Sequence, residues 1–453
     1  MTARETAFQI LLNFEQSGER LDYLTDKSLN SGNLSSKERK FVSNLVSGVI
    51  RHQTFFDWKI ASLFTGKYKK ALSKFKITLR LALYEIDFLD FIPPHATVNE
   101  YVNLAKKKLP RANISTVNAL LRTYLREGKY LKPEKKFKYE ETILAIQYSF
   151  PEWLIKRWLG IWGTDFVKNM CRVLNERPTF DIRVNEKKIS REDFRQRMIT
   201  EKIEFIPSDY FPNVFKLTDI QKIRQANLLK DGYCTVQDES GLVVSHLLNP
   251  PNPGDHILDA CVAPGSKYTS LYENYSKEIY LYGLEINPKR LMLVKDNCRR
   301  LGFPDQRLVN GDAISPPFKA IFDQILVDAP CSGFGAIQKH PDIKWRRTLK
   351  EIFTFQKLQL AILDGISKHL KPGGILIYST CTVEPSENEM VVNEFIKKQN
   401  GHFITLSPPK ELKAWTDKNN YIRTFPHLHN MEGSFAVKMQ KTEQVNKFIA
   451  KGN

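Results

Sequence analysis

The sequence lacks the long apolar run that a membrane-spanning helix needs. No 18 consecutive apolar residues occur, and the richest stretch, 81–92, is interrupted by Glu85 and Asp87. No apolar segment follows Arg4 and Glu5, so we expect no signal peptide. Cysteine is scarce as well. Six cysteines are scattered along 453 residues, which excludes a disulfide scaffold and predicts reduced thiols in a cytoplasmic protein.

Acidic residues are too few to balance the basic ones. Lysine and arginine together number 68 and aspartate and glutamate 50, which gives a net charge of +18. Half of this excess lies in residues 1–130, which hold 21 basic and 12 acidic residues. Such a charge attracts polyanions, and without a basic amphipathic anchor we expect nucleic acid rather than a membrane. A solvated basic surface without a ligand is the other interpretation.

The first third of the chain is expected to form a helical bundle, over residues 1–128. Apolar residues recur there with the 3.6-residue period of helices, and a capping box stands at 35–38. The basic, proline-containing stretch 129–139 has the composition of a linker. Residues 140–231 mix helix and strand patterns, which predicts a small α+β domain.

Residues 232–441 alternate between short apolar strands and helices. This pattern predicts an α/β domain with a mostly parallel sheet that helices cover on both faces. A short tail, 442–453, completes the chain. We predict parallel strands at 256–260, 279–285, 307–309, 325–328 and 374–379, and antiparallel edge strands at 403–406 and 434–439.

The ends of the first three of these strands suit a nucleoside cofactor. The turn 261–267 contains Gly265 and opens a helix, so its backbone can approach a ligand closely. Glu285 ends the second strand, where a carboxylate can accept from ribose hydroxyls, and Asp312 follows the third. Acids without a phosphate-binding motif favour a positively charged cofactor, S-adenosylmethionine. We predict no metal site.

Two thiols follow the fourth and fifth strands. Cys331 stands in the segment 328–333 and Cys381 in 379–382, and neighbouring strands lie only about 4.8 Å apart. A single buried cysteine is usually a small apolar residue, but two at equivalent strand ends can share one pocket. A thiol pair beside Asp328 suits methylation at carbon 5 of cytosine, because a thiolate on carbon 6 makes carbon 5 nucleophilic.

These motifs resemble the RNA cytosine-C5 methyltransferases of the NOL/NOP2/Sun type. The resemblance rests on the segments 259–267, 328–333, 378–381 and 384–389, together with Glu285 and Asp312. The segments 83–86, 94–106 and 117–122 look like a NusB-type RNA-binding domain. With 177–178 and 183–185, the pairing is similar to the bacterial branch of the family that acts on ribosomal RNA.

The resemblance implies a Rossmann-like class I methyltransferase domain, preceded by an all-α NusB-like bundle and a small α+β domain that also binds RNA. It implies methylation of a cytosine in small-subunit (16S) ribosomal RNA by a monomer, with Cys381 as nucleophile, Cys331 assisting product release and Asp328 contacting the base. The implied S-adenosylmethionine ligands are Cys261, Val262, Ala263, Pro264, Gly265, Ser266, Lys267, Glu285, Asp312 and Asp328.

One departure from the family pattern bears on the cofactor turn. Ser266 stands where the family has glycine, and in a turn with positive φ it would be strained and would weaken cofactor binding.

Three other functions remain open at this point. The chain could be an RNA-binding ribosome-assembly factor with an inactive methyltransferase fold, against which the intact Cys331, Cys381 and Asp328 argue. It could also methylate another RNA such as tRNA. A DNA methyltransferase is the third alternative, and the basic bundle favours RNA over it.

Overall fold

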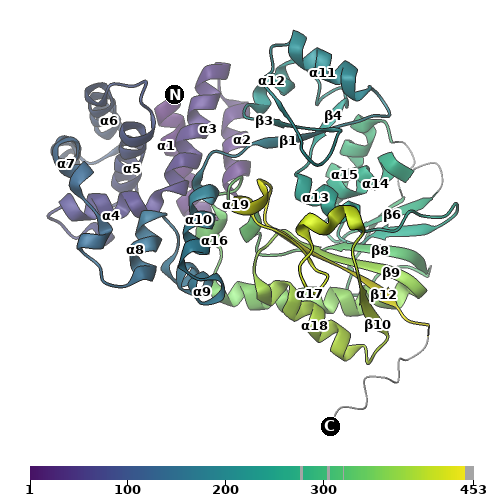
Figure 1. Ribbon diagram of the computed structural model, residues 1–453. Helices are drawn as coiled ribbons and strands as arrows, with labels where there is room; N and C mark the ends of the chain where they lie inside the picture. The colour runs from purple at the N-terminus through teal and green to yellow at the C-terminus, as the bar shows by residue number, and fades with distance from the viewer. Residues whose placement is uncertain (276–278, 304–306, 320, 444–453) are drawn as a thin grey trace. The chain divides into compact units, whose positions relative to one another are not determined.

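The computed structural model describes residues 1–275, 279–303, 307–319 and 321–443 (Figure 1). Most of the predicted tail, 442–453, therefore lies outside the described residues. The chain divides into two compact units. The helical unit holds residues 1–176 and 337–347, and the sheet-containing unit holds 177–336 and 348–453. Among the described residues, no helix is both long enough and apolar enough to cross a membrane.

The helical unit confirms the prediction of an all-α N-terminal region. The predicted capping box is present at the start of α3, where the Ser35 side chain and the Glu38 side chain bond each other's backbone N–H groups. The helices are α1 (Ala3–Ser17), α2 (Leu21–Ser31), α3 (Ser36–Arg51), α4 (Gln53–Leu63), α5 (Ser73–Phe88), α6 (Pro94–Lys108), α7 (Arg111–Glu127), α8 (Glu140–Gln147), α9 (Glu152–Trp162), α10 (Thr164–Asn175) and α16 (Ile343–Arg346).

The two units do not follow the predicted domain boundaries. Residues 140–176, predicted to open the small α+β domain, group with the helical unit. The predicted linker forms two short 3-10 helices, η2 (Gly128–Tyr130) and η3 (Pro133–Lys135), with Pro133 buried. These residues join the helical unit through packed helices, because α8 packs against α4, α9 against α8, and α10 against α9. The predicted division into three domains, a linker and a tail itself stays a prediction.

The sheet-containing unit contains the predicted mostly parallel sheet. Its strand order is β10-β12-β9-β8-β5-β6-β7, and β11 pairs with β12. The five strands from β9 to β7 are parallel, whereas β12 lies antiparallel between β9 and β10. The strands are β5 (His256–Asp259), β6 (Tyr280–Glu285), β7 (Arg307–Asn310), β8 (Phe322–Asp328), β9 (Leu370–Thr380), β10 (Phe403–Leu406), β11 (Ile422–Thr424) and β12 (Ser434–Lys441).

The placement of β12 corrects one prediction. We expected an edge strand at 434–439, but β12 is paired on both sides, with β9 on one side and both β10 and β11 on the other. The burial of Phe435, Ala436, Val437 and Met439 agrees with an internal strand covered on both faces.

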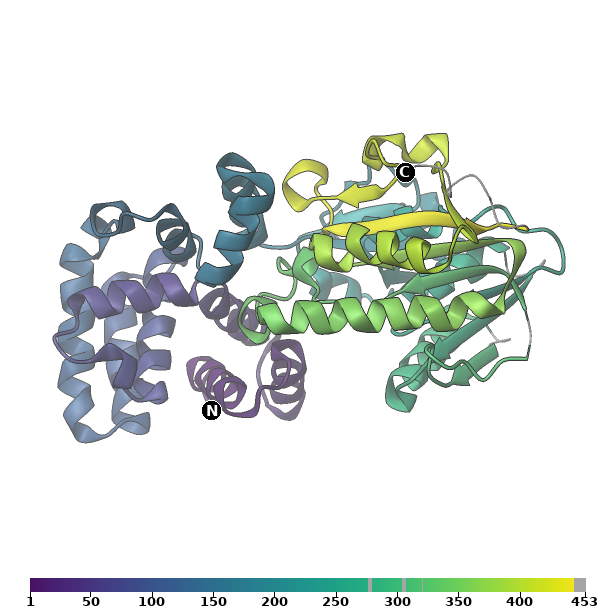
Figure 2. The same ribbon diagram turned by 90° about the horizontal axis from the view of Figure 1, so that it is seen from below.

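Each face of the large sheet packs against its own set of helices. Alternate residues of the strands point to opposite faces, so Ile257 and Leu326 pack with α13–α15, and Leu258 and Val327 pack with α17 and α18. Figures 1 and 2 both show α17 and α18 side by side along one face. These helices are α13 (Glu239–Ser245), α14 (Ser266–Tyr275), α15 (Pro288–Leu301), α17 (Leu349–Ile366) and α18 (Glu389–Lys398), and a further short helix, α19 (Pro426–His429), follows β11.

A second, four-stranded sheet precedes the large one in the chain. Its order is β2-β3-β1-β4 and all its pairs are antiparallel. Strands and helices both occur here, as the mixed patterns of residues 140–231 predicted. The elements are β1 (Phe180–Val184), β2 (Ile206–Pro207), β3 (Val214–Leu217), β4 (Cys234–Val236), α11 (Arg191–Thr200) and α12 (Ile220–Gln225).

Candidate active site

The two predicted thiols meet at the carboxyl ends of neighbouring strands. β8 and β9 are paired in parallel, with Asp328 opposite Ser379, and each strand runs into a cysteine-bearing loop. The Cys331 loop (residues 329–336) and the Cys381 loop (381–384) place the two sulfur atoms 3.0 Å apart. Cys381 is exposed and Cys331 is half-buried. The neighbouring strands that the sequence could only assume are therefore present.

Direct hydrogen bonds join the two loops. The hydroxyl groups of Ser332 and Thr382 lie 2.9 Å apart, and the Gly335 N–H donates to the Cys381 carbonyl over 3.1 Å. Because these bonds flank both thiols, the sulfur atoms are held together by the backbone as well as by their own contact.

Asp328 lies at the end of β8 with both carboxylate oxygens engaged. The Lys267 ammonium donates to Oδ2 over 2.6 Å, and the Ser379 hydroxyl donates to Oδ1 over 2.8 Å. Burial disfavours the charged form of Lys267, but Asp328 and then Cys381 outweigh it and raise the pKa of the ammonium. The structure thus groups Lys267, predicted as a cofactor ligand, with the carboxylate and the exposed thiol.

The half-buried thiols are held in their protonated form. The hydrogen bond with Cys381, followed by burial, raises the pKa of Cys331 well above its usual value. Burial and the nearby carboxylates of Asp259, Asp328 and Glu285 raise the pKa of Cys261 in the same direction. A thiol at 261 among acids is a poor nucleophile, because the thiolate is the reactive form.

The predicted cofactor turn connects β5 to α14. Gly265 has a φ of +98°, and a Cβ atom there would meet Val294 Cγ1 at 3.0 Å, so this position requires glycine. Ser266 is the first residue of α14 and does not have positive φ. The strain expected at Ser266 therefore does not arise. Val262 and Ala263 are buried, whereas Pro264 is exposed and Ser266 is partly exposed.

Glu285 and Asp312 lie at the ends of adjacent strands. Glu285 is 4% exposed, accepts the Asn287 N–H over 2.9 Å and lies 3.5 Å from the Arg290 guanidinium. Asp312 follows β7 and accepts the Ile314 N–H over 2.9 Å. The Gly311 N–H donates to the Glu285 carbonyl, which ties the two segments together.

Asp259, at the end of β5, is an unusual carboxyl group that the sequence did not single out. It is 1% exposed, and its Oδ1 has no hydrogen-bond partner among the described residues. Burial, followed by the charge of Asp328, raises the pKa of Asp259 to about 7. A buried polar atom at this strand end is suited to meet a ligand.

The raised pKa of Asp259 predicts a pH-dependent stability. The folded state binds this proton more tightly than the unfolded state, so stability falls as pH rises from about 4 to about 7. Asp259→Asn removes the ionisation and should lessen the loss of unfolding free energy between pH 5 and 8 by on the order of 2 kcal/mol. Denaturant unfolding of both proteins at the two pH values measures this. The same pH dependence of the unfolding free energy in the wild type and in Asp259→Asn would contradict the raised pKa of Asp259.

The site contains residues that sequence reasoning missed. Arg183 of β1 is buried and donates to the Ser266 carbonyl and to the Thr269 hydroxyl, each over 3.1 Å. Glu387 and Asn388 contact the two cysteine loops. Both groups lie in segments that carried the family resemblance, 183–185 and 384–389, which is the signal that could have found them.

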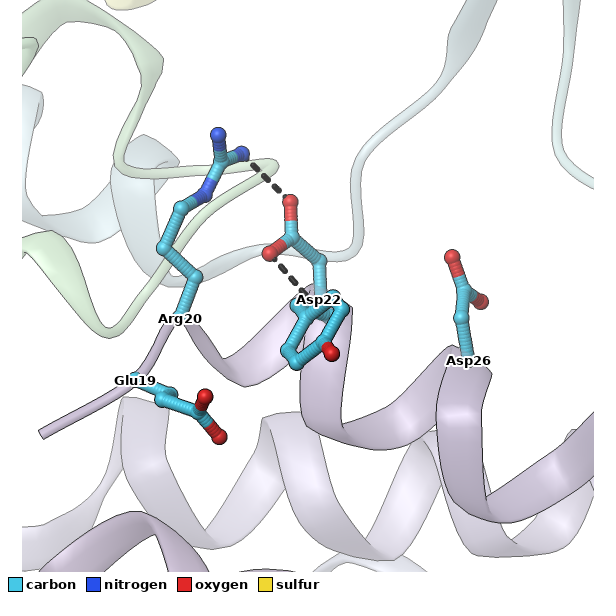
Figure 3. Close-up of a pocket in the computed structure, with 5 residues that line it drawn as sticks. Glu19, Arg20, Asp22 and Asp26 are labelled. Atoms are coloured by element: carbon cyan, nitrogen blue, oxygen red, sulfur yellow. Dashed lines mark hydrogen bonds and ion pairs between the residues drawn. The ribbon is translucent and has the colours of Figure 1, made fainter. Parts of the chain in front are cut away.

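A hollow on the surface of the helical unit is lined by other residues than those of the candidate active site. Figure 3 shows Glu19, Arg20, Asp22 and Asp26 around it, with Arg20 paired to Asp22. Its lining contains none of the predicted site residues.

Comparison with protein families divides the chain into three matched regions. The model of the 16S rRNA methyltransferase RsmB/F family matches residues 245–440. The NusB family model matches residues 1–126. The model of a ferredoxin-like domain of RsmF/B-like methyltransferases matches residues 150–224.

Similar proteins and structures extend the match over nearly the whole chain. A probable ribosomal RNA small subunit methyltransferase B of Synechocystis is 32% identical over 97% of this chain and 100% of its own length. Its counterpart in Bacillus subtilis is 30% identical over 97% and 99%. The crystal structure of PH0851 has a TM-score of 0.80 at 24% identity, over 97% of this chain and 99% of that one.

A methyltransferase homolog protein from Pyrococcus horikoshii has a TM-score of 0.56 at 26% identity, over 67% of this chain and 100% of its own. The full-length relatives at 30% identity or more decide the assignment. The chain belongs to the RsmB/F family of 16S ribosomal RNA methyltransferases.

Proposed function

We propose that this protein transfers a methyl group from S-adenosylmethionine to carbon 5 of a cytosine in small-subunit ribosomal RNA, through a covalent bond between Cys381 and carbon 6. The observation that carries the proposal is the pair of thiols 3.0 Å apart beside Asp328, at the ends of two neighbouring strands. Family membership supports the methyl donor and the ribosomal RNA substrate.

The residues of the first three strand ends fit S-adenosylmethionine. Gly265 leaves room that a Cβ atom would take, and the buried Oδ1 of Asp259 has no partner among the described residues. The residues 261–267, Glu285, Asp312 and Asp328 would hold the cofactor. When bound, it supplies a methyl group on a positively charged sulfonium, which a site rich in carboxylates favours.

Cys381 is suited to the nucleophilic step. Its exposed thiolate attacks carbon 6, and the electrons of the carbon 5–carbon 6 double bond make carbon 5 nucleophilic. Asp328 is placed to contact the base and to pass the proton of the Cys381 thiol to ring nitrogen 3, where attack at carbon 6 places negative charge. The Lys267 ammonium, 2.6 Å from Oδ2, orients this carboxylate. The cytosine must leave its stack to reach these groups, as other base-modifying enzymes require.

Cys331 is suited to the release step. After methyl transfer, carbon 5 carries both a hydrogen and the new methyl group. Removal of that proton restores the double bond and expels Cys381 as a thiolate. Cys331 lies 3.0 Å from Cys381, so it can pass its own thiol proton to the departing Cys381 sulfur and accept the carbon 5 proton in its place.

The reaction is tested by the modified nucleoside itself. The full-length protein is incubated with radioactive methyl-labelled S-adenosylmethionine and, separately, small-subunit ribosomal RNA, tRNA or DNA, and the nucleosides are then separated. The proposal predicts labelled 5-methylcytidine from ribosomal RNA. Label in a nucleoside other than 5-methylcytidine would contradict the proposal, and so would label only in tRNA or DNA, or no label at all. Where thiol variants are assayed in the same way, Cys298→Ala is the control for loss of a thiol outside the site.

Glu285 is expected to recognise the cofactor. Glu285→Ala leaves its buried partners unsatisfied and should weaken S-adenosylmethionine binding by about 1–3 kcal/mol. Calorimetry of the full-length protein measures this dissociation constant. An unchanged constant would remove Glu285 from the proposed site.

The basic helical region is expected to supply RNA affinity. Residues 1–126 match the NusB family, and half of the net charge lies in residues 1–130. Phosphate contacts by lysine and arginine release counterions, so we expect RNA binding that weakens steeply with salt.

A further inference from the structure

Two adjacent residues, Glu387 and Asn388, each form hydrogen bonds with a different cysteine loop. Both are buried, with 0% and 1% exposure. We propose that they are positioning residues that set the distance between the Cys331 and Cys381 thiols. The inference deepens the proposed function and rests on it for its catalytic meaning.

Asn388 holds the Cys381 loop on both sides of the thiol. Its side-chain oxygen accepts the Thr380 hydroxyl over 2.6 Å, and its side-chain nitrogen donates to the Thr382 carbonyl over 3.0 Å. These partners are the residues immediately before and after Cys381. One amide therefore fixes the path of the chain through the nucleophile.

Glu387 holds the Cys331 loop, with Gln359 of α17 as an intermediary. Its Oε2 accepts the Ser332 N–H over 2.8 Å and the Gln359 side-chain N–H over 3.0 Å. The same Gln359 nitrogen donates to the Pro330 carbonyl over 3.0 Å. The residues before and after Cys331 are thus held in the same way as those around Cys381.

The pair is itself anchored to the sheet. The Tyr378 hydroxyl of β9 donates to the Glu387 carbonyl over 2.5 Å. The hydrogen bonds to the two cysteine loops come from adjacent residues, so a shift of the segment 387–388 changes the position of both thiols. Reaction rates depend steeply on such geometry, and a displacement of about 1 Å can cost about a hundredfold.

Thiol separation can be measured without RNA or cofactor. Dibromobimane becomes fluorescent after it has alkylated two thiols, and peptide mapping identifies those at 331 and 381. Glu387→Ala and Asn388→Ala should slow this cross-link by about tenfold or more, because each removes two hydrogen bonds that fix a loop. The exposed Glu394→Ala in α18 is the matched control and should cross-link as the wild type does.

Conservative variants separate positioning from folding. Glu387→Gln keeps an oxygen that can accept both N–H groups, so it should restore the cross-linking rate to within about twofold. Asn388→Ser serves where the alanine variant does not fold, and should lie between the alanine variant and the wild type. Wild-type cross-linking rates in Glu387→Ala and Asn388→Ala would overturn the proposal.

The reaction adds a second, independent readout. Asn388→Ala should slow formation of the RNA adduct, and Glu387→Ala should slow its release, with the KM for S-adenosylmethionine within about twofold of wild type. Equal effects of both variants on KM alone would contradict positioning. If the variants cross-link more slowly but the wild type forms no adduct even with RNA that contains 5-fluorocytosine, the positioning of the thiols is supported and the proposed reaction is refuted instead.

Discussion

Cys331→Ala is expected to accumulate a covalent RNA complex that survives denaturing electrophoresis, whereas Cys381→Ala forms none. The asymmetry follows from the order of the steps. Cys381 makes the bond to carbon 6, so its loss should lower methylation by at least roughly a thousandfold. Cys331 acts only after methyl transfer, so its loss leaves attack intact and blocks release.

The geometry of the two thiols makes the comparison of Cys331→Ala with Cys381→Ala informative. The two sulfur atoms lie 3.0 Å apart, so either could reach the same base by distance alone. Exposure separates them, because Cys381 is exposed while Cys331 is half-buried with a raised pKa. An adduct in Cys381→Ala and none in Cys331→Ala would reverse the two roles. Cys298→Ala, in α15, should behave as wild type does.

The second large effect is expected on stability, at Arg183. This guanidinium is 2% exposed and lies 3.2 Å from the Glu273 carboxylate, in addition to its bonds with Ser266 and Thr269. Burial lowers its pKa to about 10, which leaves it charged at neutral pH. Arg183→Met leaves the buried Glu273 carboxylate with the Glu186 N–H but without its ion-pair partner, which should cost about 3–5 kcal/mol of unfolding free energy.

A double variant tests whether the charge pair is the cause. Arg183→Met combined with Glu273→Leu removes both charges and should recover most of the lost stability, since uncharged replacements of buried pairs are often neutral. Denaturant unfolding followed by circular dichroism gives both values. A double variant no more stable than Arg183→Met would place the cost elsewhere, for example in the first turn of α14.

Local patterns in the sequence were sufficient to predict most of the sheet. Each parallel strand is a short apolar run between loops, and the five predicted strands match β5, β6, β7, β8 and β9 to within a few residues. The pairing of the two thiols at the carboxyl ends of these strands was also predictable. Parallel strands bring their carboxyl ends to one edge, so Cys331 and Cys381 had to lie close once their strands were neighbours.

What the sequence could not provide depends on contacts between distant segments. Arg183 reaches a helix that begins 83 residues later, and Gln359 reaches Pro330 from another element. No periodicity encodes such pairs. The insertion of β12 between β9 and β10 is likewise decided by long-range pairing, because a short apolar run has the same sequence pattern in an edge strand as in an internal strand.

The most direct test of the covalent mechanism is to locate the bond between protein and RNA. Small-subunit ribosomal RNA that contains 5-fluorocytosine is incubated with the wild-type protein and S-adenosylmethionine, since a fluorine at carbon 5 cannot be removed as a proton and release is blocked. The protein is then digested, and mass spectrometry identifies the peptide that carries the nucleotide. The account predicts the modified base on Cys381. A nucleotide on Cys331, or a methylated product with no covalent complex at all, would contradict it.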